Sequence, residues 1–305
     1  MKEALIQELK AEFLTEQIFL NEPMSKHTTF RIGGPADVLF QPDTREQVQK
    51  IISICRKYDE AYYVIGNGSN LLVGDGGIRG VVIEFGNRYS NIDLESDESI
   101  RVQAGAMLSK AANIALQQAY TGMEFAAGIP GTIGGAVMMN AGAYGGEMKD
   151  IVEEVTLLTP DGEILTYRGE QMKFGYRRSI VSEKNYIVLD VLLKLKKGDK
   201  KLIQERMKEL SEARKTKQPL NYPSAGSTFK RPEGYFAGKL IMDAGLAGYR
   251  VGDAEVSEKH CGFVINRGNA SAKDIQELMN HVIDRVKELY DVVLEPEVRR
   301  VGEFI

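Results

Sequence analysis

The stretch GIPGTIGGAVMMNAGAYGG, residues 128–146, decides the fold class, because its glycines leave the backbone bare over a segment that carries no charged residue. Glycine has no Cβ and readily adopts φ > 0, so successive N–H groups of Gly128, Gly131, Gly134 and Gly135 can converge on one anion, such as a phosphate. The alternative is a flexible linker. Linkers are polar and rich in serine, whereas this stretch is rich in Ile, Val and Met, so its composition favours a ligand-binding loop packed in an interior.

A second glycine cluster, GNGSN at 66–70, follows the apolar run AYYVI at 61–65, which predicts a short buried strand. By itself GNGSN is weak evidence, since Asn-Gly turns are common in hairpins. A Rossmann G-x-G-x-x-G site is rejected, because Leu71 stands where the third glycine would be and an apolar run follows it. Two such clusters, about sixty residues apart, can together bind both phosphates of a dinucleotide-sized cofactor.

Composition limits the class of protein. The 305 residues predict about two domains, and the 43% hydrophobic and 27% charged content is that of an ordinary globular protein. The net charge of −4, without a basic block interleaved with aromatics, argues against a nucleic-acid partner. MKEALIQELKAEFLTEQIF at the start predicts an amphipathic helix, not a signal peptide, and no apolar run is long enough for a membrane span. We expect a cytoplasmic protein without a membrane partner.

Cysteine and histidine content argues against several kinds of chemistry. Cys55 and Cys261 are too few for a disulfide framework and are expected to be buried, and the three histidines, His27, His260 and His281, are scattered. No G-x-S-x-G motif is present. We therefore predict neither a metal site nor a Ser-His-Asp hydrolase.

Periodicity predicts a mixed chain of helices and strands without strict alternation, which indicates an α+β fold. Helices are expected at the N-terminus and at 45–58, 108–119, 200–217, 236–244 and 272–290, the last with Ser271 as its N-cap. Strands are expected within 27–43 and 292–301 and at 61–65, 80–85, 100–105, 152–158, 164–167, 187–195 and 260–266.

Seven motifs together resemble those of the UDP-N-acetylenolpyruvoylglucosamine reductase (MurB) family, in its shorter subtype. They are HTTFRIGGPA (27–36), GNGSNLL (66–72), the stretch 128–146, FGYRRS (174–179), AGSTFKRP (225–232), GFVIN (262–266) and LEPEVR (294–299). The resemblance covers residues 25–302. It implies an N-terminal helix and lead-in at 1–29 and an FAD-binding module of the p-cresol methylhydroxylase / vanillyl-alcohol oxidase type at 30–197. An α+β substrate-binding domain follows at 198–305, and its tail, 292–305, carries a catalytic Glu.

The resemblance also implies a reaction. NADPH, as co-substrate, reduces a tightly bound FAD by hydride transfer, and the hydride then passes to the enolpyruvyl ether of UDP-N-acetylglucosamine enolpyruvate. The product is UDP-N-acetylmuramate, a peptidoglycan precursor. In the family both glycine stretches hold FAD through backbone donors. The implied cofactor-binding residues are Gly66, Asn67, Gly68, Ser69, Asn70, Gly128, Ile129, Pro130, Gly131, Gly134, Gly135 and Asn140.

Hydride addition at C3 of an enolpyruvyl group places negative charge on the adjacent carboxylate system, so the site needs a cation there and a proton source for C2. The family pattern gives these roles to Arg177, Ser227 and Glu297. The planar guanidinium of Arg177 suits a carboxylate, with Arg178 as its solvated neighbour. Ser227 is a weak acid, but the carbanion-like centre that it would protonate is strongly basic.

Substrate-binding candidates are Lys217, Lys230 and Tyr144. Either lysine is a candidate for the UDP diphosphate, and Tyr144 and Asn140 are both candidates to line the flavin ring. Another flavin enzyme on the same FAD module is the main rival, and a flavin-binding protein without turnover is the non-enzymatic one. The chain lacks the insertion whose tyrosine covers the nucleotide in longer relatives. What shields the flavin, the preference for NADPH over NADH and the oligomeric state stay open, although a monomer is consistent with the sequence.

Overall fold

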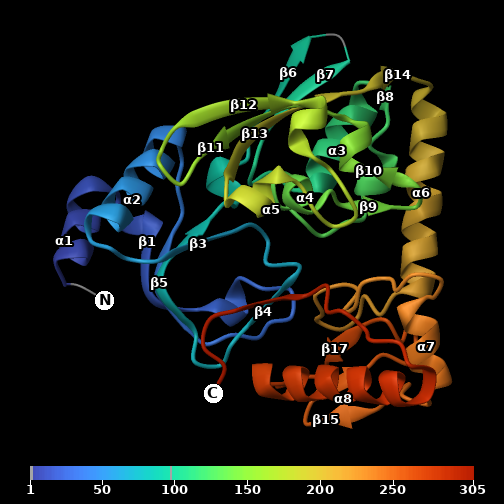
Figure 1. The fold of residues 1–305 in the computed structure, drawn as a ribbon. Helices are drawn as coiled ribbons and strands as arrows, with labels where there is room; N and C mark the ends of the chain where they lie inside the picture. Colours follow the sequence, from blue (N-terminus) through green and yellow to red (C-terminus); the bar gives the residue numbers. More distant parts are fainter. Residues whose placement is uncertain (1–2, 97) are drawn as a thin grey trace. The chain divides into compact units, whose positions relative to one another are not determined.

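The computed structural model describes residues 3–96 and 98–305, which fold into two compact units (Figure 1). The first unit comprises the N-terminal segment up to Phe19, Leu39–Asn67 and Gly80–Arg214, and the second comprises Leu20–Val38, Gly68–Arg79 and Lys215–Ile305. Each unit is therefore assembled from three separate segments. The sequence-based domains at 30–197 and 198–305 stay a prediction. The compact units have different bounds, because each unit includes segments from both halves of the chain.

A five-stranded antiparallel sheet organises the first unit. Its strands are β6 (Ile92–Ser96), β7 (Ser99–Gln103), β11 (Val152–Leu158), β12 (Ile164–Arg168) and β13 (Ile187–Lys194), in the order β12-β11-β13-β7-β6. β11 and β12, which confirm the strands predicted at 152–158 and 164–167, pair from Leu158↔Ile164 to Glu154↔Arg168 as a hairpin across Pro160, Asp161 and Gly162. The central strand β13 is buried along nearly its whole length, as expected for a strand with neighbours on both edges.

The helices of the first unit are α1 (Glu3–Glu12), α2 (Arg45–Lys57), α3 (Leu108–Gln117), α4 (Ile133–Met139), α5 (Ile180–Lys184) and the part of α6 (Lys200–Lys217) up to Arg214. The sequence analysis did not predict α4, because glycine is a poor helix former. Its residues Ile133, Ala136 and Val137 recur at helical spacing and are buried, and α4 packs on β13 and β7. Tertiary packing therefore makes this glycine-rich segment helical.

The helix predicted at 45–58 is confirmed as α2. Thr44 is its N-cap, because the Thr44 side chain accepts a hydrogen bond from the Gln47 N–H at 3.3 Å. Its apolar residues Val48, Ile51, Ile52 and Cys55 recur at helical spacing and are all buried.

A four-stranded sheet has the order β1-β2-β5-β3, with β1 (Ile18–Pro23), β2 (Pro35–Phe40), β3 (Tyr62–Ile65) and β5 (Ile78–Glu84). The strand predicted at 61–65 exists, but the prediction that it is buried is wrong. Tyr63 and Val64 are 40% and 39% exposed, and only Ile65 is buried. β3 is an edge strand paired in parallel with β5 alone, so it lacks a neighbour on its other side.

The second unit contains a three-stranded antiparallel sheet of β15 (Arg250–Val251), β16 (Ala254–Val256) and β17 (Val264–Asn266), with α7 (Ala237–Asp243) and α8 (Ala272–Tyr290). α8 packs on β15, β16 and α7. Its predicted N-cap is confirmed, because the Ser271 hydroxyl accepts from the Asp274 N–H at 3.0 Å and the Asp274 carboxylate accepts from the Ser271 N–H at 2.9 Å.

Short strands complete the structure. β4 (Leu71–Val73) pairs in parallel with β18 (Arg299–Val301) in the second unit, so the apolar run after GNGSN is a strand and not a helix, as the sequence indicates. In the first unit β8 (Tyr120–Thr121) pairs with β14 (Lys196–Lys197), and β9 (Gly142–Ala143) pairs with β10 (Gly146–Glu147).

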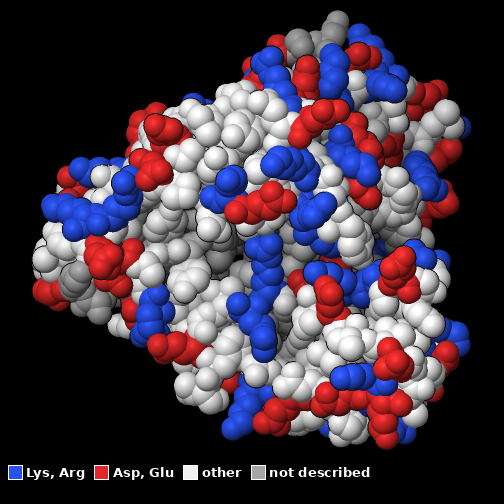
Figure 2. Space-filling view, viewed as in Figure 1, with Lys and Arg blue, Asp and Glu red and all other residues white. Residues whose placement is uncertain are grey.

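Cys55 and Cys261 are buried free thiols, as predicted, and burial raises the pKa of Cys55 to about 12. Within residues 3–96 and 98–305, no group of three or more His, Cys, Asp or Glu side chains is arranged to hold a metal ion. None of the described helices is long and apolar enough to cross a membrane. Acidic and basic side chains are interspersed over most of the face shown in Figure 2.

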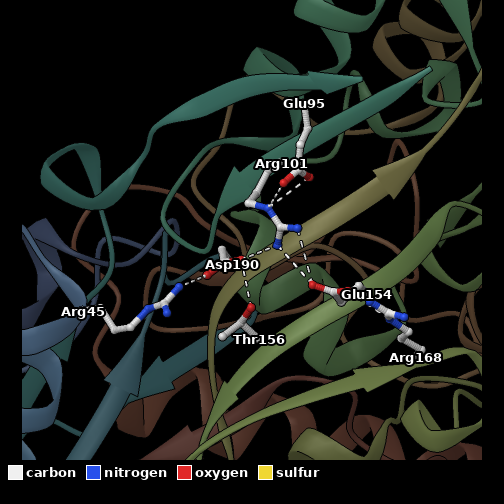
Figure 3. A network of polar contacts seen from close by, with 7 residues as sticks. All are labelled: Arg45, Glu95, Arg101, Glu154, Thr156, Arg168 and Asp190. Carbon is white, nitrogen blue, oxygen red and sulfur yellow. Dashed lines mark hydrogen bonds and ion pairs between the residues drawn. The ribbon is translucent and has the colours of Figure 1, made fainter. Parts of the chain in front are cut away.

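The side chain of Asp190, on β13, is 7% exposed and connects α2 to the five-stranded sheet (Figure 3). Its carboxylate accepts hydrogen bonds from Arg45 at 2.8 Å, from Arg101 at 2.9 Å and from Thr156 at 2.9 Å. Arg101 also contacts Glu95 on β6. These bonds join the first turn of α2 to β7, β11 and β13.

We predict that Asp190→Ala lowers the free energy of unfolding by about 3 kcal/mol, because it leaves Arg45 and the buried Thr156 hydroxyl without this acceptor and removes one of the three carboxylates that bind Arg101. Asp93→Ala is the matched control, since Asp93 lies on β6 directly opposite Arg101 but is exposed, and its expected effect is within about 0.5 kcal/mol. Urea denaturation of both variants measures the difference. Equal stability of the two variants would contradict this role of Asp190.

Candidate active site

The two glycine stretches meet in the first unit. A Cβ on Gly66 would lie 2.2 Å from the Thr132 hydroxyl oxygen, so position 66 accepts only glycine beside Thr132. The Asn67 amide donates to the Pro130 carbonyl at 2.6 Å. Residues sixty-three positions apart therefore form one surface, as the sequence analysis inferred from their composition.

The glycines of the 128–135 segment have different roles. The Gly134 N–H donates to the Ala104 carbonyl at 2.8 Å, and a Cβ on Gly134 would lie 2.9 Å from the Ala104 Cβ. The sequence-based expectation that the N–H of Gly134 points to a ligand is therefore wrong, because that N–H is used in packing. Gly135 differs, since a Cβ there would meet only the Thr132 hydroxyl oxygen, at 3.6 Å, and the residue is exposed. The backbone at Gly135 faces open space in which a ligand can lie.

Arg214, near the end of α6, was missed by the sequence analysis. Its guanidinium donates to the carbonyl of Gly128 and lies near Tyr144, and its burial lowers the pKa of the guanidinium. In the sequence Arg214 is one of many charges on a solvated helix, so only tertiary structure distinguishes it. It places a positive charge beside the bare glycine backbone, where a diphosphate would be stabilised.

The boundary between the units falls inside the GNGSN motif, after Asn67. In the second unit Gly68 has φ 58°, and a Cβ there would lie 2.1 Å from the His27 carbonyl oxygen, so glycine is required. The Asn70 side chain donates to the Glu297 carbonyl at 3.1 Å, and the Arg299 N–H donates to the Asn70 carbonyl at 2.9 Å. The end of the predicted cofactor-binding motif, Ser69 and Asn70, is thereby joined to the predicted catalytic tail.

Ser227 and Glu297 lie on two neighbouring segments of the second unit. The Glu297 N–H donates to the Thr228 carbonyl at 2.8 Å, and Phe229 and Pro296 form an antiparallel bridge. Thr228 is fully buried and its hydroxyl accepts from the Val264 N–H at 2.9 Å, whereas Ser227 is exposed and Glu297 is partly exposed. The structure therefore brings together two of the three residues that the sequence analysis selected as catalytic.

The two candidate lysines differ in their surroundings. The Lys230 ammonium lies 3.0 Å from the Glu295 carboxylate, and the backbone N–H of Lys230 donates to the Glu295 carbonyl at 2.8 Å. Lys217 is exposed at the last residue of α6.

Arg177 lies at a tight turn of the first unit. Gly175 and Arg178 exchange backbone hydrogen bonds of 3.0 and 3.3 Å across the turn, and Arg177 adopts φ 55°. The Arg177 guanidinium carbon lies 5.1 Å from the centre of the Tyr176 ring, and Arg178 is exposed. The turn therefore presents Arg177 in a left-handed conformation that non-glycine residues adopt rarely.

Tyr144 and Asn140 occupy different environments. Tyr144 (φ 53°) and Gly145 (φ 90°) form the turn between β9 and β10, and Tyr144 is 43% exposed. Asn140 is 1% exposed, and its amide bonds the Glu147 carboxylate, the Gly175 carbonyl and the Lys149 N–H. The contact of Asn140 with a flavin ring stays a prediction, and in the structure its polar atoms are used within the first unit.

These features fit FAD. The backbone at Gly135 is exposed, Gly66 and Thr132 are in close contact, and the Arg214 cation lies on Gly128 of the same segment, so bare backbone and a positive charge are both available to a diphosphate. The neighbouring residues Ile129, Pro130 and Gly131 belong to the same segment.

Comparisons with known proteins agree with this interpretation. Residues 36–168 match the family model described as "FAD binding domain", and residues 218–301 match "UDP-N-acetylenolpyruvoylglucosamine reductase, C-terminal domain". Proteins named UDP-N-acetylenolpyruvoylglucosamine reductase are similar over nearly the whole chain. The protein from Clostridium tetani is 53% identical, with 95% of this chain and 94% of the relative covered. The one from Caldanaerobacter subterraneus is 51% identical, with 99% and 100% covered. The crystal structure of MurB from Thermus caldophilus superposes with a TM-score of 0.79 at 40% identity and covers 93% of this chain and 98% of that chain.

An FAD-binding domain followed by this C-terminal domain defines an FAD-dependent oxidoreductase. The chain belongs to the UDP-N-acetylenolpyruvoylglucosamine reductase (MurB) family. It uses FAD and NADPH to reduce UDP-N-acetylglucosamine enolpyruvate to UDP-N-acetylmuramate in peptidoglycan precursor synthesis. The predicted family, fold class, activity and cofactors are confirmed. The length of the chain, 305 residues, fits the shorter subtype of the family.

We predict that Gly135→Ala weakens FAD binding by about tenfold or more, equivalent to ~1.4 kcal/mol, because the new methyl group occupies the face on which the cofactor lies. The apoprotein should fold normally, since nothing within the first unit opposes a Cβ at this position. Fluorescence titration of the apoprotein with FAD measures the affinity.

The control is Gly134→Ala, whose Cβ collides with Ala104 and should lower the stability of the apoprotein by about 1–3 kcal/mol. If Gly135→Ala binds FAD as tightly as the unmodified protein, the cofactor does not lie against this backbone.

Proposed function

We propose that Arg177, Ser227 and Glu297 act on the enolpyruvyl group in this chain. The observation that supports the proposal best is the pairing of the Ser227 and Glu297 segments, with the Glu297 N–H bonded to the Thr228 carbonyl at 2.8 Å. The buried neighbour Thr228 fixes this segment through its hydroxyl, while Ser227 faces solvent.

Bound FAD supplies the chemistry that accepts hydride from NADPH and donates it to C3 of the enolpyruvyl ether. The task of the protein is to stabilise the negative charge that develops on the carboxylate system. Arg177 binds this carboxylate through its planar guanidinium, whose two N–H donors can bond both carboxylate oxygens.

Ser227 donates a proton at C2, the carbon next to the one that receives hydride. Gly226 immediately before it has φ 77°, so the backbone turns sharply at this point and leaves the hydroxyl on an exposed loop. Glu297 acts beside Ser227 and orients the substrate carboxylate together with Arg177. In this proposal Arg177 and Glu297 act on the substrate carboxylate, and Ser227 transfers the proton.

For the UDP diphosphate we propose Lys217 over Lys230. The Lys230 ammonium is already paired with the exposed Glu295 carboxylate, whose negative charge would lie next to a bound diphosphate. Lys217 is exposed at the end of α6.

Tyr144 is proposed to contact substrate from the exposed β9–β10 turn. From the sequence alone we also propose that the enzyme acts in the cytoplasm and that a monomer is sufficient.

Ser227→Ala tests the assignment of the proton donor. The variant should retain FAD and be reduced by NADPH at the normal rate, whereas reoxidation of its flavin by UDP-N-acetylglucosamine enolpyruvate should slow by about 10²- to 10⁴-fold, because the general acid is missing. Anaerobic stopped-flow absorbance follows the two half-reactions separately. Ser224→Ala, in the same loop, is the matched control and should behave as the unmodified protein.

Normal reoxidation of Ser227→Ala would reject the assignment. A flavin that is reduced by NADPH but is not reoxidised by the substrate even in the unmodified protein would favour the rival flavin enzyme with another substrate.

A further inference from the structure

Asn140 ends α4 and is a buried polar residue near the Arg177 turn, with 1% of its surface exposed. It is the C-cap residue and adopts the left-handed conformation, with φ 44° and ψ 55°. Asparagine is among the few non-glycine residues that tolerate this conformation. The backbone conformation therefore explains why the residue is Gly or Asn, but not which of the two it is.

The amide of Asn140 makes three hydrogen bonds, two to the segment 147–149 and one to Gly175. Its Nδ2 donates to the Glu147 carboxylate at 2.8 Å and to the Gly175 carbonyl at 3.2 Å. Its Oδ1 accepts from the Lys149 N–H at 2.9 Å. A glycine at this position could make none of these bonds, so they are what the side chain adds.

The bond to Gly175 fixes the base of the turn that carries Arg177. The same Gly175 carbonyl accepts from the Arg178 N–H at 3.3 Å, and the Gly175 N–H donates to the Arg178 carbonyl at 3.0 Å. Arg177, inside this turn, has φ 55°, a conformation that a non-glycine residue keeps only when its surroundings enforce it. The hydrogen bond from Asn140 to the Gly175 carbonyl comes from outside the turn and helps to hold it in this conformation.

The bond to Glu147 acts on the charge beside Arg177. The pKa of Glu147 is lowered chiefly by its bond with the Lys149 ammonium at 2.8 Å, then by the Asn140 amide and the nearby Arg177 charge, against the opposing effect of burial. Glu147 is therefore an anion that Lys149 and Asn140 together hold in place.

We propose that Asn140 is a positioning residue for Arg177, because one buried amide bonds the Gly175 carbonyl at the base of the Arg177 turn and ties that turn to the 147–149 segment. The inference rests on the proposed role of Arg177 at the substrate carboxylate. Asn140 contributes to catalysis through the orientation of that guanidinium and not through contact with the substrate.

Asn140→Gly separates positioning from helix capping. Glycine adopts the left-handed conformation more easily than asparagine, so the end of α4 is preserved while the three side-chain bonds are lost. The matched control is Asn185→Gly, because Asn185 is also a left-handed C-cap, with φ 53° at the end of α5, and is exposed.

Anaerobic stopped-flow absorbance of the FAD-loaded variants tests the proposal. In Asn140→Gly, FAD content and reduction by NADPH should be normal, and reoxidation by saturating UDP-N-acetylglucosamine enolpyruvate should slow by about 100-fold, because a misplaced group loses its catalytic orientation. Asn185→Gly should be normal in both half-reactions. Arg177→Ala should slow reoxidation at least as much, and adding Asn140→Gly to it should cause no further loss, since Asn140 acts through Arg177.

Each outcome decides one point. Normal reoxidation in Arg177→Ala would reject the proposed role of Arg177 itself. A slow Arg177→Ala with a normal Asn140→Gly, or losses that multiply in the double variant, would overturn the positioning role alone. If Asn140→Gly does not accumulate as a folded flavoprotein, Asn140→Asp replaces it, because the carboxylate keeps the acceptor for Lys149 but lacks the amide donor. If both variants lose FAD, Asn140 serves cofactor binding, as the family resemblance implies, and the positioning inference is wrong.

Discussion

The close approach of Gly66 to Thr132 is the constraint on which the cofactor-binding surface depends. A Cβ at position 66 would lie 2.2 Å from the Thr132 hydroxyl oxygen, so the two glycine stretches touch only because one of them has no side chain there. The Asn67 bond to the Pro130 carbonyl then fixes their register. Because the backbone itself forms this surface, its shape is set by main-chain packing and needs little side-chain ordering when a ligand binds.

The same glycine-rich segment is hydrogen-bonded to the turn that carries Arg177. Apolar residues of α4 bury themselves on β13 and β7, and Asn140 at the end of α4 bonds Gly175 and Glu147. Arg214 contacts the segment at its beginning, through Gly128. The stretch 128–146 therefore provides bare backbone, contacts the cation of Arg214 and, through Asn140, supports the turn of Arg177. Bare backbone N–H groups and cations are what an anionic cofactor and an anionic substrate require.

Local patterns predicted well the elements whose stability is local. The helix α2 and the N-cap Ser271 appear in the structure as the sequence indicates, because periodicity and caps act over a few residues. Predictions failed where tertiary context decides. The helix α4 was missed because burial on a sheet overrides the low helix propensity of glycine, and the burial of β3 was wrong because sequence does not reveal an edge strand. Arg214 and the bonds of Asn140 were not predictable, since their partners are far away in the sequence.

The most direct measurement is the absorbance of the flavin in the unmodified protein under anaerobic conditions, first with NADPH and then with UDP-N-acetylglucosamine enolpyruvate. The account predicts that NADPH bleaches the flavin and that the substrate restores its colour within a single turnover, with UDP-N-acetylmuramate formed in equal amount. A protein that takes up no FAD, or a bleached flavin whose colour this substrate does not restore, would contradict it.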